Sequence, residues 1–163
     1  MAPSDCPNRL ARSYNAPMRI LLLNGPNLNK LGTREPEVYG TATLADIERL
    51  VAERAARFGA EVRSFQANGE GELIDWLQGE QQAADGLIIN AGAYSHYSIA
   101  LRDAVAGCGL AAIEVHISNV YRRETFRHVS LLSPVCSGTI VGLGVHGYVL
   151  AVEALANLLE RTP

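Results

Sequence analysis

The sequence predicts an α/β protein, in which five parallel strands form one sheet with helices on both faces. Short apolar runs alternate along the chain with segments of helical periodicity, which is typical of βα units that build a covered parallel sheet. The length of 163 residues suits one domain and is too short for two ordinary ones. We therefore expect a single domain.

Five apolar runs are predicted to be the strands of this sheet. The third and fourth are almost wholly apolar, as expected of strands that are buried on both faces. In chain order the five runs are residues 19–23, 61–66, 86–89, 111–115 and 139–141.

Four helices are predicted between and after these strands. The first, residues 43–58, has Thr43 as a plausible N-cap and ends at Gly59. Its apolar face should contain Leu44, Ile47, Val51, Ala55 and Phe58. The others are residues 70–84, 98–108 and 148–159. Five strands with intervening helices favour the flavodoxin-like strand order, in which ligands bind beyond the carboxyl ends of the strands, near the first and third.

The composition favours a small-molecule partner over nucleic acid or membrane. A net charge of -3 does not suit a phosphate-binding surface, and no apolar run reaches the ~20 residues needed to span a bilayer. Cys6, Cys108 and Cys136 show no metal or CxxC spacing, which fits a reducing, cytoplasmic location. We interpret residues 1–17 as a flexible N-terminal extension and residues 18–163 as the functional domain.

Polar residues directly follow three of the predicted strands. Asn24, Asn90 and His116 come after the first, third and fourth, so their side chains should converge on one crevice. The alternative is that each of them only caps a turn.

The connection after the first strand is unusually long. It runs for about 18 residues, NGPNLNKLGTREPEVYGT, where such loops usually have ~2–6. Its asparagines, glycines, Arg34 and Tyr39 suit a lid over a ligand. Neither GxxxxGK[ST] nor GxGxxG is present, so it is not predicted to hold phosphates.

A second polar segment, NAGAYSHYS, leads from Asn90 into a predicted helix. The free N–H groups at that helix start could bind an anion or a hydroxyl, with His96 beside them. The alternative is that Ser95 or Ser98 caps the helix and His96 is simply exposed.

A third polar segment, EVHISNVYRRETFRH, begins at the fourth strand. Glu114 and His116 alternate along that strand and should face the same side, where a carboxylate can orient and charge an imidazole. A carboxylate-binding edge could form from Arg122, Arg123, Arg127 and the backbone N–H groups of Ile117 and Ser118. The alternative is a solvated turn with incidental charges.

The remaining residue types indicate proton-transfer chemistry. The histidines show no metal-ligand pattern, and Lys30, the only lysine, lies on the long loop rather than in a buried strand where a Schiff base could form. A tyrosine that acts as a base near neutral pH must lower its pKa from ~10 to ~7, which costs roughly 4 kcal/mol. Arg34, on the same loop as Tyr39, could supply the positive charge that does so.

Five motifs, in this order and spacing, resemble type II 3-dehydroquinases over nearly everything from Met18 onward. They are GPNLNKLGTREPEVYG, FQANGEGELIDWL, INAGAYSHYSIALRDA, IEVHISNVYRRETFRH and GLGVHGYVLAVEAL. The resemblance implies a flavodoxin-like subunit, assembled as a homododecamer, that interconverts 3-dehydroquinate and 3-dehydroshikimate by anti elimination through an enolate. It implies no cofactor and no metal.

The resemblance also implies roles for single residues. Tyr39 would remove the proton beside the ketone with help from Arg34, and Asn27 would hold the enolate oxygen through a water. His116, oriented by Glu114, would protonate the departing hydroxyl. The residues that bind substrate would be Asn90, His96, Arg127, the backbone at Ile117 and Ser118, and, from a neighbouring subunit, Asp103.

Four positions depart from the commoner family pattern, and three other functions stay open. Gly69, Tyr97, Val129 and His146 leave the fine shape of the pocket and the subunit contacts in doubt. The alternatives are a non-catalytic flavodoxin-like binding module, an interaction protein that has lost turnover, and the same chemistry used to break down quinate rather than to make aromatic compounds.

Overall fold

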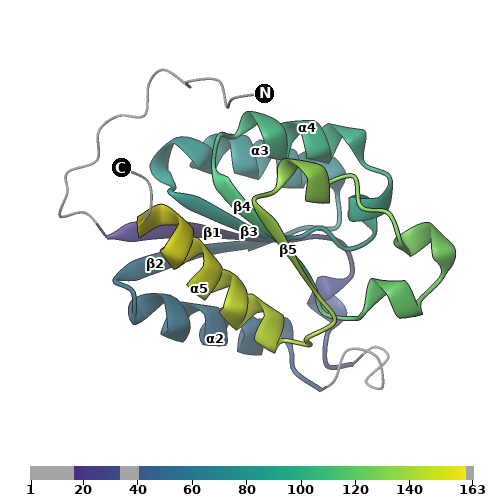
Figure 1. The fold of residues 1–163 in the computed structure, drawn as a ribbon, viewed down its shortest axis with the longest axis horizontal. Coiled ribbons are helices and arrows are strands. Elements are labelled where there is room, and N and C mark those ends of the chain that lie inside the picture. The colour runs from purple at the N-terminus through teal and green to yellow at the C-terminus, as the bar shows by residue number, and fades with distance from the viewer. Residues whose placement is uncertain (1–16, 34–40, 161–163) are drawn as a thin grey trace.

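The sheet has the strand order that the sequence predicts. The computed structural model describes residues 17–33 and 41–160 (Figure 1). Five parallel strands pair in the order β2-β1-β3-β4-β5. They are β1 (Met18–Asn24), β2 (Ala60–Gln66), β3 (Gly86–Asn90), β4 (Ala111–His116) and β5 (Gly138–Val141). The flavodoxin-like fold is therefore confirmed, whereas residues 1–16 of the predicted extension lie outside the described residues.

Two pairs of helices cover the sheet, one pair on each face (Figure 1). α2 (Leu44–Ala56) and α5 (His146–Glu160) pack on one face, against residues such as Ile20, Ile88 and Val115. α3 (Glu70–Glu80) and α4 (Ile99–Gly107) pack on the other face, against Leu21 and Leu87. Adjacent strand residues thus belong to different cores, as the alternation of a β-strand requires.

The helix boundaries follow the capping signals with two corrections. Thr43 does cap α2, since its hydroxyl accepts from the N–H of Asp46 and that carboxylate accepts from the N–H of Thr43. The prediction for Phe58 is wrong: α2 ends at Ala56, and Phe58 is 41% exposed beyond its last turn. The second predicted helix ends at Glu80 rather than residue 84, because the backbone tightens into a 3-10 turn before β3.

A buried hydrogen-bond chain ties α5 to the centre of the sheet. The Asn90 amide donates to the Tyr148 hydroxyl (2.8 Å), which donates to Oδ1 of Asn24 (2.8 Å). All three side chains are almost fully buried, and burial raises the pKa of Tyr148 far above its usual value. The phenol therefore stays neutral and serves both asparagines, which fixes the carboxyl ends of β1 and β3.

We predict that Tyr148→Phe destabilises the fold by about 2–4 kcal/mol, because the buried amide nitrogen of Asn90 and the buried amide oxygen of Asn24 lose the hydroxyl they bond to. Equilibrium urea unfolding measures this loss. The matched control is Tyr121→Phe. The Tyr121 ring is 65% exposed, so loss of its hydroxyl should change the free energy of unfolding by less than about 0.5 kcal/mol. Equal effects of the two variants would show that the chain contributes no stability.

Candidate active site

The site forms where the strand order reverses between β1 and β3. The loops that follow these strands touch: the N–H of Gly25 donates to the carbonyl of Asn90 (2.8 Å). A Cβ atom at Gly25 would lie 2.5 Å from the Ala91 carbonyl oxygen, so only glycine allows this approach. Beyond it opens a pocket whose lining includes Asn27, Leu28, Leu31, Asn90, His96, His116, Ile117, Ser118, Val120, Arg123 and Arg127.

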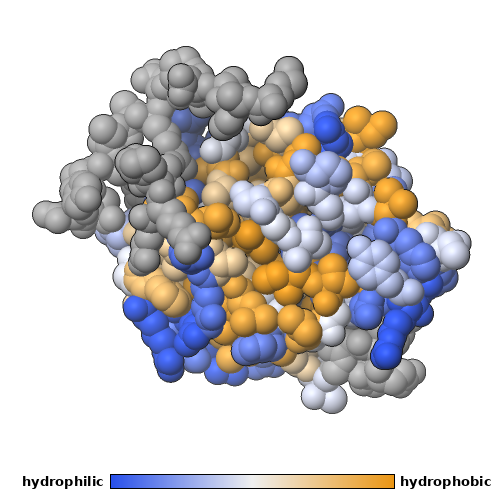
Figure 2. All heavy atoms as spheres, viewed as in Figure 1, coloured by the Kyte–Doolittle hydropathy of each residue, from blue (hydrophilic) through white to orange (hydrophobic). Residues whose placement is uncertain are grey.

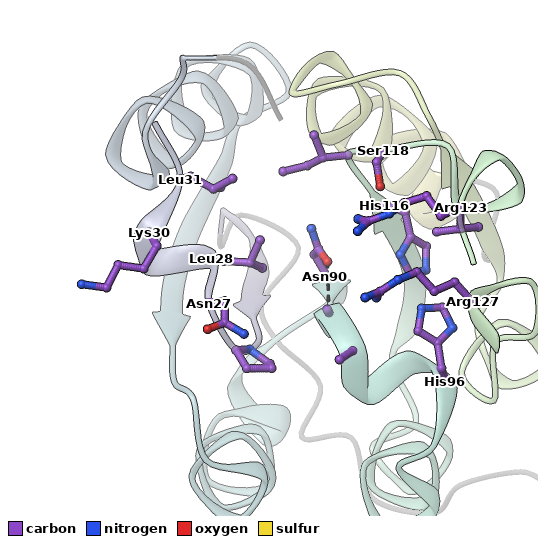
Figure 3. A pocket seen from close by; sticks show the side chains of 15 residues that line it. Asn27, Leu28, Lys30, Leu31, Asn90, His96, His116, Ser118, Arg123 and Arg127 are labelled. Atoms are coloured by element: carbon purple, nitrogen blue, oxygen red, sulfur yellow. Dashed lines mark hydrogen bonds between the residues drawn. The ribbon is translucent and has the colours of Figure 1, made fainter. Parts of the chain in front are cut away.

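The pocket has two walls with Asn90 between them (Figure 3). The first wall, formed by Asn27, Leu28 and Leu31, comes from the loop after β1 and its 3-10 turn η1 (Leu28–Lys30). The second wall carries the histidines and arginines that follow β3 and β4. Lys30 also belongs to the lining of the pocket, and its amino group points outward in Figure 3.

Asn27 has an unusual backbone that the neighbouring loop holds in place. Its φ of 66° is the single positive value outside glycine in the described part of the chain. Its N–H donates to Oδ1 of Asn68 (3.0 Å), and the Asn68 carbonyl accepts from the Tyr94 hydroxyl (2.8 Å). The side-chain amide of Gln66 also donates to Oδ1 of Asn68 (3.1 Å). Strain of this kind persists where surrounding contacts over-determine it, and it is common at binding sites.

Two of the three predicted strand-end residues enter the pocket. Asn90 and His116 both line it, whereas the prediction for Asn24 is wrong. Asn24 is fully buried beneath the pocket floor, where its oxygen accepts from Tyr148. A strand-end position alone does not reveal whether a side chain turns toward the ligand or back toward a helix.

His116 and Glu114 form a buried pair, as their alternation along β4 predicts. Nε2 of His116 lies 2.9 Å from Oε1 of Glu114, whose side chain has no exposed surface. Burial alone would raise the pKa of Glu114, but hydrogen bonds from His116, Ser133 and Ser130 outweigh it and hold that pKa at about 2. Glu114 is therefore a carboxylate near neutral pH and accepts the Nε2 proton of His116, which leaves Nδ1 for a ligand.

His96 lies beside this pair with a different tautomer. Its ring packs against the His116 ring at 5.9 Å between centroids, and its Nδ1–H donates to the Val129 carbonyl (2.8 Å). Burial lowers the pKa of His96, and the charges of His116 and Arg127 lower it further. His96 therefore stays neutral and turns Nε2 outward as an acceptor. Ser98 caps α4, as the alternative proposed, but His96 is half-buried rather than simply exposed.

Two arginines of the second wall share one carboxylate. Nε of Arg127 donates to Glu124 (2.9 Å), and Nε of Arg123 lies 3.6 Å from the same oxygen. Nε of each guanidinium thus faces the Glu124 carboxylate, and both arginines line the pocket. Ile117 and Ser118 line the pocket directly after β4. Arg122 lies outside this pocket and lines an adjoining shallow hollow.

The other predicted residues lie elsewhere. Asp103 is exposed on α4, in a hollow between α3 and α4 that is separate from this pocket. Tyr39 and Arg34 lie outside the described residues. Within residues 17–33 and 41–160, no cluster of three or more His, Cys, Asp or Glu side chains could hold a metal ion.

Sequence reasoning missed several residues of the site. Leu28 and Leu31 give the first wall an apolar surface. The one sequence signal for them was that leucines within a polar loop are usually buried. Ser130 and Ser133, which donate to Glu114, lie 16 and 19 residues from it in the chain, and no pattern in the sequence links them. Tyr148 is equally remote from Asn24 and Asn90.

Comparisons with known proteins point to one family. The dehydroquinase class II family model matches residues 18–156. A 3-dehydroquinate dehydratase of Roseiflexus castenholzii is 57% identical over 146 residues, which cover 90% of this chain and 93% of that protein. The catabolic 3-dehydroquinase 1 of Aspergillus terreus is 53% identical over 140 residues, with coverage of 86% and 92%. The crystal structure of a type II dehydroquinase from Butyrivibrio crossotus superposes with a TM-score of 0.83 at 47% identity, covering 85% of this chain and 97% of that one.

The depressed pKa of Glu114 predicts that stability falls in acid. Because the carboxyl has a pKa of about 2 in the folded protein against 4.5 in the reference state, its contribution is complete above pH 4.5 and is lost as the pH falls toward 2. The expected loss is about 3 kcal/mol. Unfolding followed from pH 6 to pH 2 should show a shallower decline for Glu114→Gln than for the exposed control Glu61→Gln. Parallel curves would contradict this view of Glu114.

Proposed function

The chain belongs to the class II dehydroquinase family, and we infer that it is a 3-dehydroquinate dehydratase, a hydro-lyase that converts 3-dehydroquinate to 3-dehydroshikimate and water. The family match over residues 18–156 and the dehydratases that share more than half of its sequence support this activity. One structural observation carries the chemistry: a buried carboxylate–imidazole pair opens on a pocket rich in hydrogen-bond donors. These findings favour an enzyme over a non-catalytic flavodoxin-like binding module.

The elimination begins with loss of the proton on the carbon beside the ketone. Tyr39 takes this proton as a phenolate, and Arg34 keeps that phenolate accessible through its positive charge. Both residues lie in the segment 34–40, which follows directly from the first wall of the pocket in the chain. The negative charge moves onto the ketone oxygen, and the resulting enolate is held by Asn27, through a water molecule.

The second step is departure of the hydroxyl group. His116, protonated at Nδ1, gives its proton to the leaving oxygen, so that the carbon–oxygen bond breaks and water forms. The electron pair of the enolate becomes the new carbon–carbon double bond, and no cofactor takes part. Glu114 supports the imidazolium, since it accepts the Nε2 proton at 2.9 Å.

The remaining pocket residues bind the substrate. Asn90, whose amide is oriented by Tyr148, and neutral His96 accept and donate to the ring hydroxyls. The backbone N–H groups of Ile117 and Ser118 bind the carboxylate, and Arg127 lies across the pocket lining from Asn27 (Figure 3). A cyclic hydroxy-ketone acid offers the groups that match these partners.

We propose that residues 18–163 form the catalytic domain of a cytoplasmic homo-oligomer, as a dodecamer, in which Asp103 completes a neighbouring site. Large apolar side chains support an interface between copies: Tyr97, Ile99, Tyr121, Phe126 and Val129 are each 62–65% exposed. Further apolar atoms gather across the middle of the face on which α5 and β5 lie (Figure 2). No described helix has both the length and the apolar character that crossing a bilayer requires.

The chemistry is the same for biosynthesis of aromatic compounds and for quinate breakdown. We propose the biosynthetic shikimate pathway, because the relatives from Roseiflexus castenholzii, Azorhizobium caulinodans and Anoxybacillus flavithermus carry the general dehydratase name, whereas the Aspergillus terreus relative is named a catabolic enzyme.

We predict that the wild-type protein produces the enone absorbance of 3-dehydroshikimate from 3-dehydroquinate, and that His116→Ala lowers kcat by about 10²–10⁴ through loss of the general acid. The control is His128→Ala, which should keep most activity, because the exposed His128 ring hydrogen-bonds to the Arg123 carbonyl and packs against the Tyr121 ring. Absence of any absorbance rise with wild-type protein would favour a binding module instead.

We also predict different kinetic effects for substitutions of Tyr39 and Arg34. Tyr39→Phe should abolish most turnover without changing the fold, because only one hydroxyl is removed. Arg34→Ala should lower kcat and move the pH at which activity appears upward, since a phenolate forms less readily without a nearby positive charge. Initial rates between pH 5 and pH 10 measure both effects. An unaltered pH profile in Arg34→Ala would remove its electrostatic role.

A further inference from the structure

Two serines outside the pocket lining hold the carboxylate behind the proposed acid. The segment that follows the arginines returns to β4, and both serine hydroxyls donate to Glu114. We propose that Ser130 and Ser133 are positioning residues that set how tightly the Glu114–His116 pair holds its proton, and so how strong an acid His116 is during dehydration. This inference rests on the proposed function, because it takes His116 as the general acid.

The Ser130 hydroxyl has no choice of partner. Its oxygen accepts from the backbone N–H groups of Leu132 and Ser133, each at 3.1 Å, so both of its acceptor positions are used. Its hydrogen is left to bond with Oε1 of Glu114 at 2.8 Å, the same oxygen that meets His116. The turn thus directs the hydroxyl at the contact between carboxylate and imidazole.

Ser133 reaches the other oxygen of the carboxylate. Its hydroxyl donates to Oε2 of Glu114 and accepts from the hydroxyl of Thr139 at 3.2 Å. Thr139 is exposed, and the Ser133 side chain makes no other hydrogen bond in the described part of the chain. Removal of this hydroxyl therefore takes one donor from the carboxylate and leaves no other buried group without a partner.

The number of donors decides how the carboxylate charge is shared. A carboxylate in a low-dielectric site with the imidazole as its sole donor would bind that ring's proton very strongly, and the imidazolium would then be a poor acid. Two hydroxyl donors take up part of the negative charge and weaken its hold on His116. They also keep Glu114 ionised, consistent with its pKa of about 2. With fewer donors to the carboxylate, the imidazolium should therefore hold its proton more tightly.

Other charged or titratable groups near the pair do not replace this effect. His96 packs on His116 and stays neutral, since burial lowers its pKa, and Arg127 faces both rings from the second wall. Burial and the negative charge of Glu114 both raise the pKa of the Cys136 thiol, to about 12, so this thiol is uncharged at ordinary pH. Among the described residues, the two hydroxyls are thus the neutral donors through which the pair is adjusted.

The test compares Ser133→Ala, Ser133→Thr and the control Ser137→Ala in the intact protein. Ser137 lies in the same segment, is exposed, and makes no side-chain hydrogen bond that reaches the pair. In Ser133→Ala, kcat should fall about tenfold and the alkaline limb of its pH profile should rise by about one unit, with KM changed less than about twofold because Ser133 does not line the pocket. Ser133→Thr, which keeps the hydroxyl, and Ser137→Ala should resemble wild type.

A second readout is independent of turnover. The chain has 4 histidines, so ring signals of histidine-labelled, ligand-free protein can be assigned by removing His116, and their titration followed by NMR. The His116 midpoint should move to higher pH in Ser133→Ala and not in Ser137→Ala. An unchanged midpoint in folded Ser133→Ala overturns the inference even if the enzyme is active. A wild-type protein that titrates as expected but does not dehydrate 3-dehydroquinate overturns the proposed function instead.

Ser130→Ala separates the electrostatic part from the structural part. It should shift the titration in the same direction, and it should also lower the melting temperature because two backbone N–H groups lose their acceptor. A loss of thermal stability without any shift in the titration would show that Ser130 only shapes the turn.

Discussion

The structure of the site depends on one buried negative charge, the Glu114 carboxylate at the end of β4. A charge with no exposed surface is costly unless each oxygen is paired, and here three side chains pair them. That requirement fixes three things at once. It sets the ring plane of His116, it draws the segment containing Ser130 and Ser133 back onto the sheet, and it directs the other nitrogen of the imidazole into the pocket.

The strand order supplies the opposite wall. Because β1 and β3 are neighbours and their chains leave in different directions, a pocket opens between the loops that follow them. Contact between Gly25 and Asn90 closes its floor, and the hydrogen bonds of Asn68 hold Asn27 in a strained backbone above it. The proposed acid, His116, therefore lies on the sheet, while the proposed base, Tyr39, follows the first wall in the sequence. This division suits a reaction in which a substrate must enter before acid and base can act together.

The sequence predicted features that follow from local residue patterns, and it missed side-chain orientations that depend on partners distant in the chain. Apolar runs identified all five strands, and alternation along β4 predicted the contact between Glu114 and His116. The sequence could not show that Asn24 turns away from the pocket, because the hydrogen-bond partner of Asn24, Tyr148, is 124 residues further along the chain. Phe58 matched the helical period, yet α2 ends at Ala56, two residues before it, and the Phe58 ring stays 41% exposed. The resemblance implied roles for Asn90 and His96, but only the fold shows that both residues line the same pocket.

Two stacked histidines line one pocket, and only one of them is proposed as the general acid. Their rings lie 5.9 Å apart, so two positive charges there would repel each other, and Arg127 adds a third. The hydrogen-bond partners break the symmetry: His116 faces a carboxylate, whereas His96 faces the uncharged carbonyl of Val129. Glu114 therefore accepts a hydrogen bond from His116, while burial lowers the pKa of His96 and leaves its Nε2 as an acceptor. His96 ends the 3-10 turn η3 (Gly92–His96) and His116 ends β4, so the proposed difference in function comes from the buried glutamate two residues before His116 and not from the histidines themselves.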